Sequence, residues 1–227
     1  MIPPWRVKVD GEETTAVFEP ATASQSGAVF VCAHGAGGHM ADRGMLRLTQ
    51  VLRARNFDLV RFNFLYREKG SGRPDAMPRL QACLEAVVTR TRAELGPRTL
   101  IIGGRSMGGR AASLLAAKGL ACDALLLLAY PLHPAGKPEQ LRDAHLPKIK
   151  VPVLCINGTR DSLCRRDLME CVLGTVSPTW KMHWLDGADH AFHVLKSSGR
   201  TDDQVLDEAA DVSGQWLSRL VRAQSCA

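Results

Sequence analysis

Short stretches rich in hydrophobic residues recur along the chain and alternate with stretches that have the spacing of amphipathic helices. Strands are predicted at 28–33, 57–62, 99–102, 124–129, 151–156 and 181–185. Helices are predicted between or after them at 43–55, 75–95, 110–117, 167–173 and 204–221, the first with Asp42 as its N-cap. This alternation predicts an α/β fold, with a mostly parallel central sheet that carries helices on both faces.

Two regions depart from this alternation. At the N-terminus, 6–9 and 14–18 read as short strands joined by the turn Asp10-Gly11-Glu12, which predicts an antiparallel hairpin at a sheet edge. The connection 131–150 is expected to hold one helical turn at 138–141, and it is too short for a large lid domain. Residues 1–227 are therefore expected to form a single domain.

Composition narrows the class of protein. Hydrophobic residues make up 45% and charged residues 23% of the 227 positions, and no apolar run reaches the ~20 residues that cross a bilayer. The N-terminus lacks the pattern of a signal peptide. Seven cysteines without a CxxC pair, the last being Cys226, are expected to be reduced thiols of a cytoplasmic or nuclear protein. The net charge of +6 is spread along the chain, so neither a nucleic-acid nor a membrane partner is expected.

One tight turn carries the candidate chemistry. Gly104-Arg105-Ser106-Met107-Gly108 fits the pattern G-x-S-x-G between a predicted strand and a predicted helix, which is where this pattern forms a nucleophile elbow. We expect the tightness of the turn to require glycine at Gly104 and Gly108. Ser106 is expected to have a strained backbone and to raise its hydroxyl clear of the sheet.

A serine nucleophile needs a base, and the base needs an acid that orients it. Asp161 follows one strand and His190 follows the last strand, so the chain offers these groups in the order Ser, Asp, His. Asp161 could instead simply begin the next helix, and His193 is an alternative base. Asp189 adjoins His190 on one loop and cannot easily reach behind its ring.

An oxyanion would need two backbone N–H donors. Met107 heads the helix after the elbow, and we favour Ala36, in the loop after the strand 28–33, as the second donor. Gly35 and Gly37 would let that loop approach a substrate closely.

Other side chains near the strand ends are candidates for a substrate pocket. His34 is expected either to hold its loop through a hydrogen bond or to line the pocket. His39 and His133 would line the pocket or be solvated loop histidines. Arg105 would pair with a substrate carboxylate or, as we favour, brace a neighbouring loop. Three basic residues of the loop 63–74 either recognise an anionic substrate or are simply solvated; these are Arg67, Lys69 and Arg73.

No cofactor or metal is expected. His190 and His193 have an H-x-x-H spacing, but the pattern supplies no third ligand. Gly35-Ala36-Gly37 follows a strand, but the third glycine of a dinucleotide fingerprint would fall on Met40.

These motifs resemble those of the α/β-hydrolase superfamily, near the dienelactone hydrolases. A narrower resemblance is to the testis-expressed protein 30 family of predicted hydrolases and its bacterial relatives, which includes a subunit of the non-specific-lethal chromatin complex. It is carried by Gly103–Gly108, by Tyr130-Pro131-Leu132-His133 and by Leu141-Arg142-Asp143. The resemblance covers about 28–220 and implies an α/β-hydrolase fold and a Ser106–Asp161–His190 triad, but no substrate. Arg105 beside the nucleophile departs from typical esterases.

The sequence thus predicts a cytoplasmic or nuclear serine hydrolase that cleaves a small ester, thioester or related acyl bond through an acyl-enzyme on Ser106. The short connection before Val151 predicts an open site, which favours small acyl groups. A non-catalytic interaction module is the main alternative, and a peptidase or acyltransferase with the same triad is a second one. The oligomeric state stays open.

Overall fold

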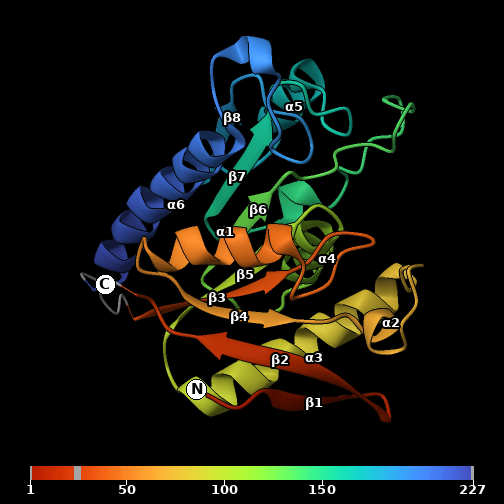
Figure 1. The fold of residues 1–227 in the computed structure, drawn as a ribbon, viewed down its shortest axis with the longest axis vertical. Helices are drawn as coiled ribbons and strands as arrows, with labels where there is room; N and C mark the ends of the chain where they lie inside the picture. Colours follow the sequence, from red (N-terminus) through yellow and green to blue (C-terminus); the bar gives the residue numbers. More distant parts are fainter. Residues whose placement is uncertain (1, 23–26, 226–227) are drawn as a thin grey trace.

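The computed structural model describes residues 2–22 and 27–225, in which one sheet of eight strands runs through the molecule (Figure 1). The strand order is β1-β2-β4-β3-β5-β6-β7-β8. The pairs β1–β2 and β2–β4 are antiparallel, and all the other pairs are parallel. The strands are β1 (Trp5–Val9), β2 (Glu12–Glu19), β3 (Ala28–Ala33), β4 (Asp58–Phe62), β5 (Thr99–Arg105), β6 (Ala124–Leu128), β7 (Val153–Gly158) and β8 (Trp180–Leu185).

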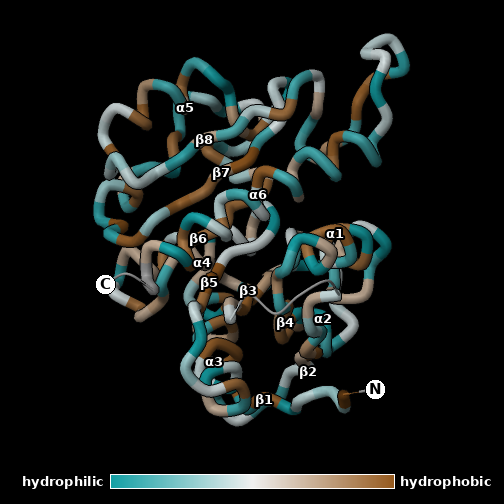
Figure 2. The backbone as a smooth tube through the Cα atoms, turned by 90° about the vertical axis from the view of Figure 1, so that its left-hand side faces the viewer, coloured by the Kyte–Doolittle hydropathy of each residue, from teal (hydrophilic) through white to brown (hydrophobic). Residues whose placement is uncertain are grey.

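Helices cover both faces of this sheet, as predicted. They are α1 (Arg43–Arg53), α2 (Leu65–Glu68), α3 (Met77–Leu95), α4 (Met107–Ala117), α5 (Arg166–Leu173) and α6 (Asp202–Ser225), with 3-10 turns η1 (Leu146–Lys148) and η2 (Lys196–Ser198). Helices α1 and α6 pack on one face, and α3, α4 and α5 on the other. In Figure 2, hydrophobic colour gathers on inner strands such as β7, because these strands are buried on both sides.

Strand β3 shows how the sequence pattern produces the two-sided core. Phe30 and Cys32 face the side of α1 and α6, whereas Val29 and Val31 face the side of α3 and α4. All four are at most 2% exposed. A continuous apolar run therefore supplies core side chains to both faces of the sheet. At the start of α1, the Asp42 carboxylate accepts the Met45 N–H at 2.8 Å, as its predicted capping role requires.

The connection between β6 and β7 contains η1 as the one helical turn among its residues, all of which the structure describes. The helical turn predicted at 138–141 is therefore wrong: the turn forms at 146–148. Leu141 is 37% exposed, whereas Leu146 is fully buried, so burial of an apolar side chain favours the later position. The loop predicted at 63–74 also contains the short helix α2, whose Leu65 and Tyr66 are buried.

The six cysteines within the described ranges are free thiols; Cys226 lies outside those ranges. Burial raises the pKa of Cys32 to about 12, as expected of a thiol that packs as a small hydrophobe. No helix in the described part of the chain combines the length and the apolar character needed to span a bilayer.

Candidate active site

The turn between β5 and α4 holds Ser106 in a strained backbone conformation. Its φ is 49° and its ψ is −113°, a region that non-glycine residues rarely adopt. The Ser106 N–H donates to the Leu128 carbonyl at 2.9 Å, and the Ser106 carbonyl accepts the Arg110 N–H at 3.0 Å. One bond ties the serine to the neighbouring strand and the other to the first turn of α4, and together they hold the conformation.

The glycines on either side of Ser106 are required by the close approach of β3. A Cβ atom on Gly104 would lie 2.1 Å from the Ala33 carbonyl oxygen, and one on Gly108 would lie 2.6 Å from the same atom. Gly104 also has a φ of +131°. In contrast, a Cβ on Gly35 would make ordinary contacts, while Gly37 needs glycine only for its φ of +74°.

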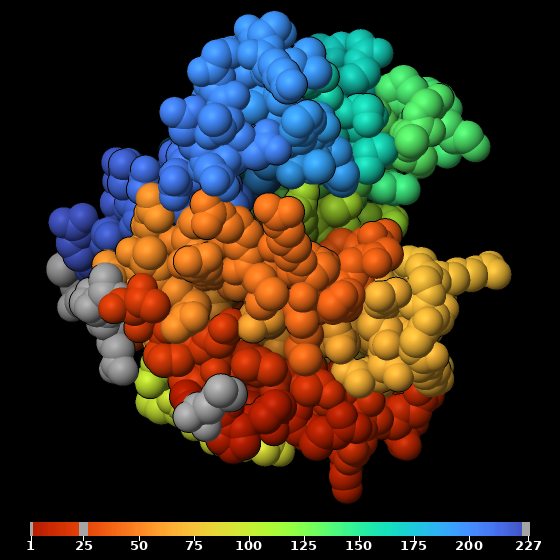
Figure 3. Space-filling model, viewed as in Figure 1, coloured from red at the N-terminus to blue at the C-terminus, as the bar shows by residue number. Residues whose placement is uncertain are grey.

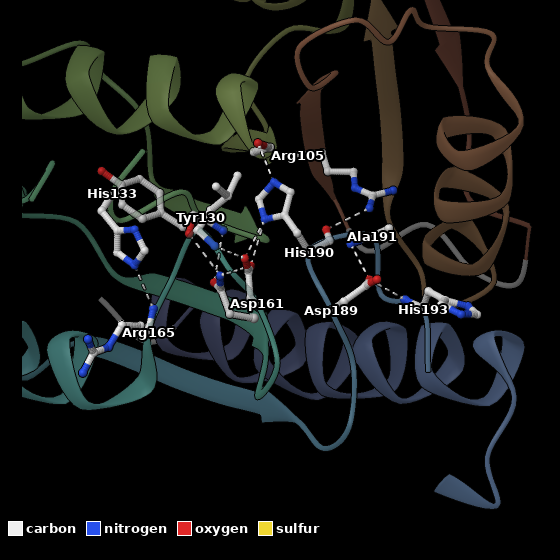
Figure 4. A network of polar contacts seen from close by, with 12 residues as sticks. Arg105, Tyr130, His133, Asp161, Arg165, Asp189, His190, Ala191 and His193 are labelled. Atoms are coloured by element: carbon white, nitrogen blue, oxygen red, sulfur yellow. Dashed lines mark hydrogen bonds and ion pairs between the residues drawn. The ribbon is translucent and has the colours of Figure 1, made fainter. Parts of the chain in front are cut away.

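Three side chains from distant parts of the chain meet at this turn (Figure 4). His190 Nε2 lies 2.8 Å from Ser106 Oγ, and His190 Nδ1 lies 2.9 Å from both carboxylate oxygens of Asp161. A carboxylate only accepts, so Nδ1 carries the proton and Nε2 is free to accept the serine O–H. The Asp161 side chain is fully buried, and that of His190 is 26% exposed.

Asn157, near the end of β7, orients the buried carboxylate and is not among the site residues predicted from the sequence. Its Nδ2 donates to Asp161 Oδ2 at 2.9 Å and to the Tyr130 carbonyl at 3.0 Å. Its Oδ1 accepts the Tyr130 N–H at 3.0 Å. The Leu163 N–H donates to the other carboxylate oxygen at 2.8 Å. A lone amide at the end of a buried apolar strand was the one sequence signal for this role.

The two alternative groups on the His190 loop have other partners. Asp189 Oδ1 accepts the N–H groups of Ala191 and His193, at 2.7 and 3.0 Å, and so shapes the loop (Figure 4). The His193 ring lies 2.9 Å from Asp202 and is 58% exposed. The structure therefore places His190, and not His193, against Ser106.

Arg105 braces the loop that carries His190, the role that we favoured for it. Its Nη2 donates to the His190 carbonyl at 3.2 Å, and its guanidinium carbon lies 5.4 Å from the centre of the Phe192 ring. Burial lowers the pKa of Arg105, and the charges of Asp42 and Asp189 oppose that shift. Arg105 also lines a cavity next to Ser106.

The expectation that His34 lines a pocket is wrong, because its ring is fully buried. Its Nδ1 is 2.8 Å from the Gly35 carbonyl, and its Nε2 accepts the Phe64 N–H at 3.1 Å. Burial lowers the pKa of His34 to about 4. His34 therefore holds its loop as a neutral ring.

His133 is also structural, and both roles expected for it are wrong. It is 2% exposed, its Nδ1 lies 3.0 Å from the Pro134 carbonyl, and its Nε2 accepts the Arg165 N–H at 3.2 Å. His39 is half-buried and accepts the Ala41 N–H at 3.2 Å. Neither ring lines the cavities at Ser106 that the structure shows among its described residues.

Two cavities meet at Ser106, and both are also lined by Ala36 and Leu163. The first, which we call the His190 cavity, has a volume of about 380 Å³ and includes Arg105 and His190 in its wall. The second, which we call the Arg110 cavity, has a volume of about 360 Å³; its wall includes Met77, Leu80, Met107, Arg110, Pro131 and Arg142. The basic residues of the 63–74 loop line neither cavity; Lys69, for example, pairs with Glu12 at 2.7 Å.

A third cavity, of about 610 Å³, continues from Arg105 and Ala191 to α1 and the start of α6. It lies where the orange α1 and the blue C-terminal segment meet in Figure 3. Among the described residues, no group of three or more His, Cys, Asp or Glu side chains is arranged to hold a metal ion.

Comparisons with known proteins agree with this fold. The chain is similar to an α/β serine hydrolase homologue from Coxiella burnetii (18% identity, TM-score 0.74, covering 97% of this chain and 96% of that one). It is also similar to a lidless α/β serine hydrolase from Xanthomonas campestris (22%, 0.71, 92% and 93%) and to a dienelactone hydrolase from Anabaena variabilis (18%, 0.73, 96% and 96%). A family model described as an alpha/beta hydrolase domain matches residues 26–218. The chain therefore belongs to the α/β-hydrolase domain family.

Proposed function

We propose that this protein is a serine hydrolase that cleaves a small ester, thioester or related acyl bond through an acyl-enzyme on Ser106. The observation that carries the proposal is the continuous hydrogen-bonded chain from Ser106 Oγ through the His190 ring to the buried Asp161 carboxylate. Membership of the α/β-hydrolase family supports it. The narrower kinship with the testis-expressed protein 30 family and the cytoplasmic or nuclear location are part of the same proposal.

In the first step, Ser106 Oγ attacks the acyl carbon while His190 Nε2 takes the serine proton. Asp161 stabilises the imidazolium that forms. The N–H groups of Met107 and Ala36 would stabilise the oxyanion. His190 then gives its proton to the leaving oxygen or sulfur atom, while the bond between that atom and the acyl carbon breaks.

In the second step, a water molecule replaces the leaving group. His190 takes a proton from the water, whose oxygen forms a bond to the acyl carbon, and then returns the proton to Ser106 Oγ as the acyl bond breaks. The products are a carboxylic acid and an alcohol or thiol. The short connection between β6 and β7 leaves the site open, which favours small acyl groups.

A fluorophosphonate probe tests the proposal, since it forms a bond only to an activated serine. We expect the wild type to be labelled and Ser106→Ala to remain unlabelled. Absence of labelling in the wild type, or equal labelling of the variant, would leave the non-catalytic interaction module as the better interpretation.

Steady-state ester hydrolysis tests the roles of the other two residues. His190→Ala and Asp161→Asn should each lower kcat by about 10³- to 10⁴-fold, as in other triads of this type. His193→Ala is the matched control, because the His193 ring lies on the same loop but contacts Asp202 and not Ser106. Product analysis with added amine or alcohol acceptors separates a hydrolase from an acyltransferase or a peptidase.

A further inference from the structure

Two arginines from different parts of the chain line the Arg110 cavity. Arg110 lies one helical turn after Ser106 on α4, about 6 Å along the helix axis. Arg142 comes from the connection between β6 and β7. Its backbone is held at both ends, since its N–H donates to the Leu132 carbonyl at 2.7 Å and its carbonyl accepts the Tyr130 O–H at 2.8 Å. Both cations are therefore placed beside the nucleophile by ordered backbone.

Neither guanidinium group has an ion pair or a side-chain hydrogen bond within the described residues, and Arg110 Nε is buried without a partner. Burial lowers the pKa of Arg142, and the nearby charge of Arg110 lowers it further. Burial and then the same Arg110 charge lower the pKa of His145 to about 4, so that ring is neutral near pH 7. Both side chains are half-buried, and a partly desolvated cation without a partner is destabilising, more so beside a second cation.

The one carboxylate that lines this cavity does not offset the two cations. Asp75 accepts the Tyr66 N–H at 3.1 Å and lies 3.6 Å from the Arg79 Nε. Its charge is thus committed to the neighbouring backbone and to a third arginine. The cavity keeps a net positive charge that an anionic ligand would neutralise.

The proposed hydrolysis, on which this inference rests, indicates which part of the substrate occupies each of the two cavities. His190 must protonate the leaving group, so the leaving group occupies the cavity that His190 lines. The acyl group then extends into the Arg110 cavity, along the apolar side chains of Met77, Leu80 and Pro131.

We propose that Arg110 and Arg142 bind a carboxylate at the far end of the acyl group. The preferred substrate is then a half-ester or half-thioester of a short dicarboxylic acid. The planar guanidinium fork matches a carboxylate in geometry and charge, and the single helical turn between Ser106 and Arg110 limits the acyl chain to a few carbons.

Hydrolysis of three p-nitrophenyl esters with matched acyl chains tests this proposal. The first is the p-nitrophenyl half-ester of adipic acid, which ends in a free carboxylate. In the second ester, called the amide below, an uncharged amide replaces that carboxylate. The third is the p-nitrophenyl ester of 6-aminohexanoate, which ends in an ammonium group. The wild type should favour the half-ester over the amide by about 10- to 100-fold in kcat/KM, the worth of charge-assisted hydrogen bonds, and should turn over the cationic ester least. A ratio of half-ester to amide of one or less in the wild type would overturn the inference.

Arg110→Gln and Arg142→Gln should each lower the ratio of half-ester to amide by about tenfold. Arg219→Gln, which removes an exposed arginine from α6, is the control that should keep the wild-type ratio. An unchanged ratio in both cavity variants would refute the assignment. The two substitutions lie in different segments, so if one variant does not fold the other still decides.

Binding to an inactive protein separates this inference from the proposed function. Calorimetry with adipamate, the monoamide anion, should show binding to Ser106→Ala and loss of binding when Arg110→Gln or Arg142→Gln is added. The carboxylate subsite alone is refuted if the wild type is labelled by the fluorophosphonate and hydrolyses the ester with the terminal amide, but shows no preference for the half-ester. Adipamate binding to a wild type that is not labelled refutes hydrolysis alone.

Discussion

The approach of β3 to the elbow makes Gly104→Ala the sharpest test of the strained turn. A Cβ atom on Gly104 would lie 2.1 Å from the Ala33 carbonyl oxygen and 2.5 Å from the Ala33 nitrogen. Ala33 and Gly104 are register partners in neighbouring central strands, so relief of the overlap must separate β3 from β5. The φ of +131° adds backbone strain.

These two costs can be separated with a second glycine. Gly119 has a φ of +96°, and a Cβ atom there would have nothing within 4 Å. Gly119→Ala should therefore lower the unfolding free energy only by the ~1–2 kcal/mol that an unfavourable backbone region costs. Gly104→Ala carries a similar strain and the overlap as well, and should lose about 4 kcal/mol or more of unfolding free energy.

Urea unfolding, followed by circular dichroism, measures both losses, with the m-value checked for each variant. If the unfolding free energies of the two variants differ by less than about 1 kcal/mol, β3 does not approach the elbow as closely as the 2.1 Å overlap requires.

Three further perturbations test the residues that support the proposed triad. Asn157→Leu should lower kcat about tenfold, because Asp161 loses one charge-assisted hydrogen bond, and should cost about 1–3 kcal/mol in stability, because the Tyr130 N–H loses its acceptor. Arg105→Met should lower kcat/KM about tenfold, because the His190 loop loses its brace. The pKa of His34 is about 4 in the folded protein and 6.5 without burial, so the unfolded state binds more protons between these values. The unfolding free energy should therefore fall as the pH falls from 6.5 to 4, by up to about 3 kcal/mol, and His34→Gln should remove that part of the slope in urea titrations.

The first of these perturbations has a result that would contradict it, and the other two have a control variant within the chain. Full activity of Asn157→Leu would show that Leu163 and His190 suffice to orient Asp161. Arg160→Met removes an exposed arginine that donates to the Gly187 carbonyl at 3.0 Å, so it should keep the activity that Arg105→Met loses. Asp202 raises the pKa of His193, whose contribution to stability is therefore lost as the pH rises. His193→Gln should then change the slope in the opposite sense to His34→Gln.

The sequence by itself determined the order of strands and helices and the place of the candidate nucleophile. The apolar runs and helical periods are local, and they predicted the eight strands and five of the six α-helices in the described residues. The spacing Gly104-x-Ser106-x-Gly108 reports a steric limit of the turn, which any chain must obey. Parallel strands end at one edge of their sheet, so Ser106, Asp161 and His190 could be expected to meet there.

Tertiary structure alone decided what the polar residues around that edge do. His34 and His133 follow predicted strands, where pocket residues are expected, but burial and backbone hydrogen bonds make both structural. The hydrogen bond between Asn157 and Tyr130 and the closeness of Arg110 to Arg142 depend on how the β6–β7 connection folds back over α4. Local pattern carries no information about such contacts, because they join residues 27 to 32 positions apart whose side chains are brought together only by packing.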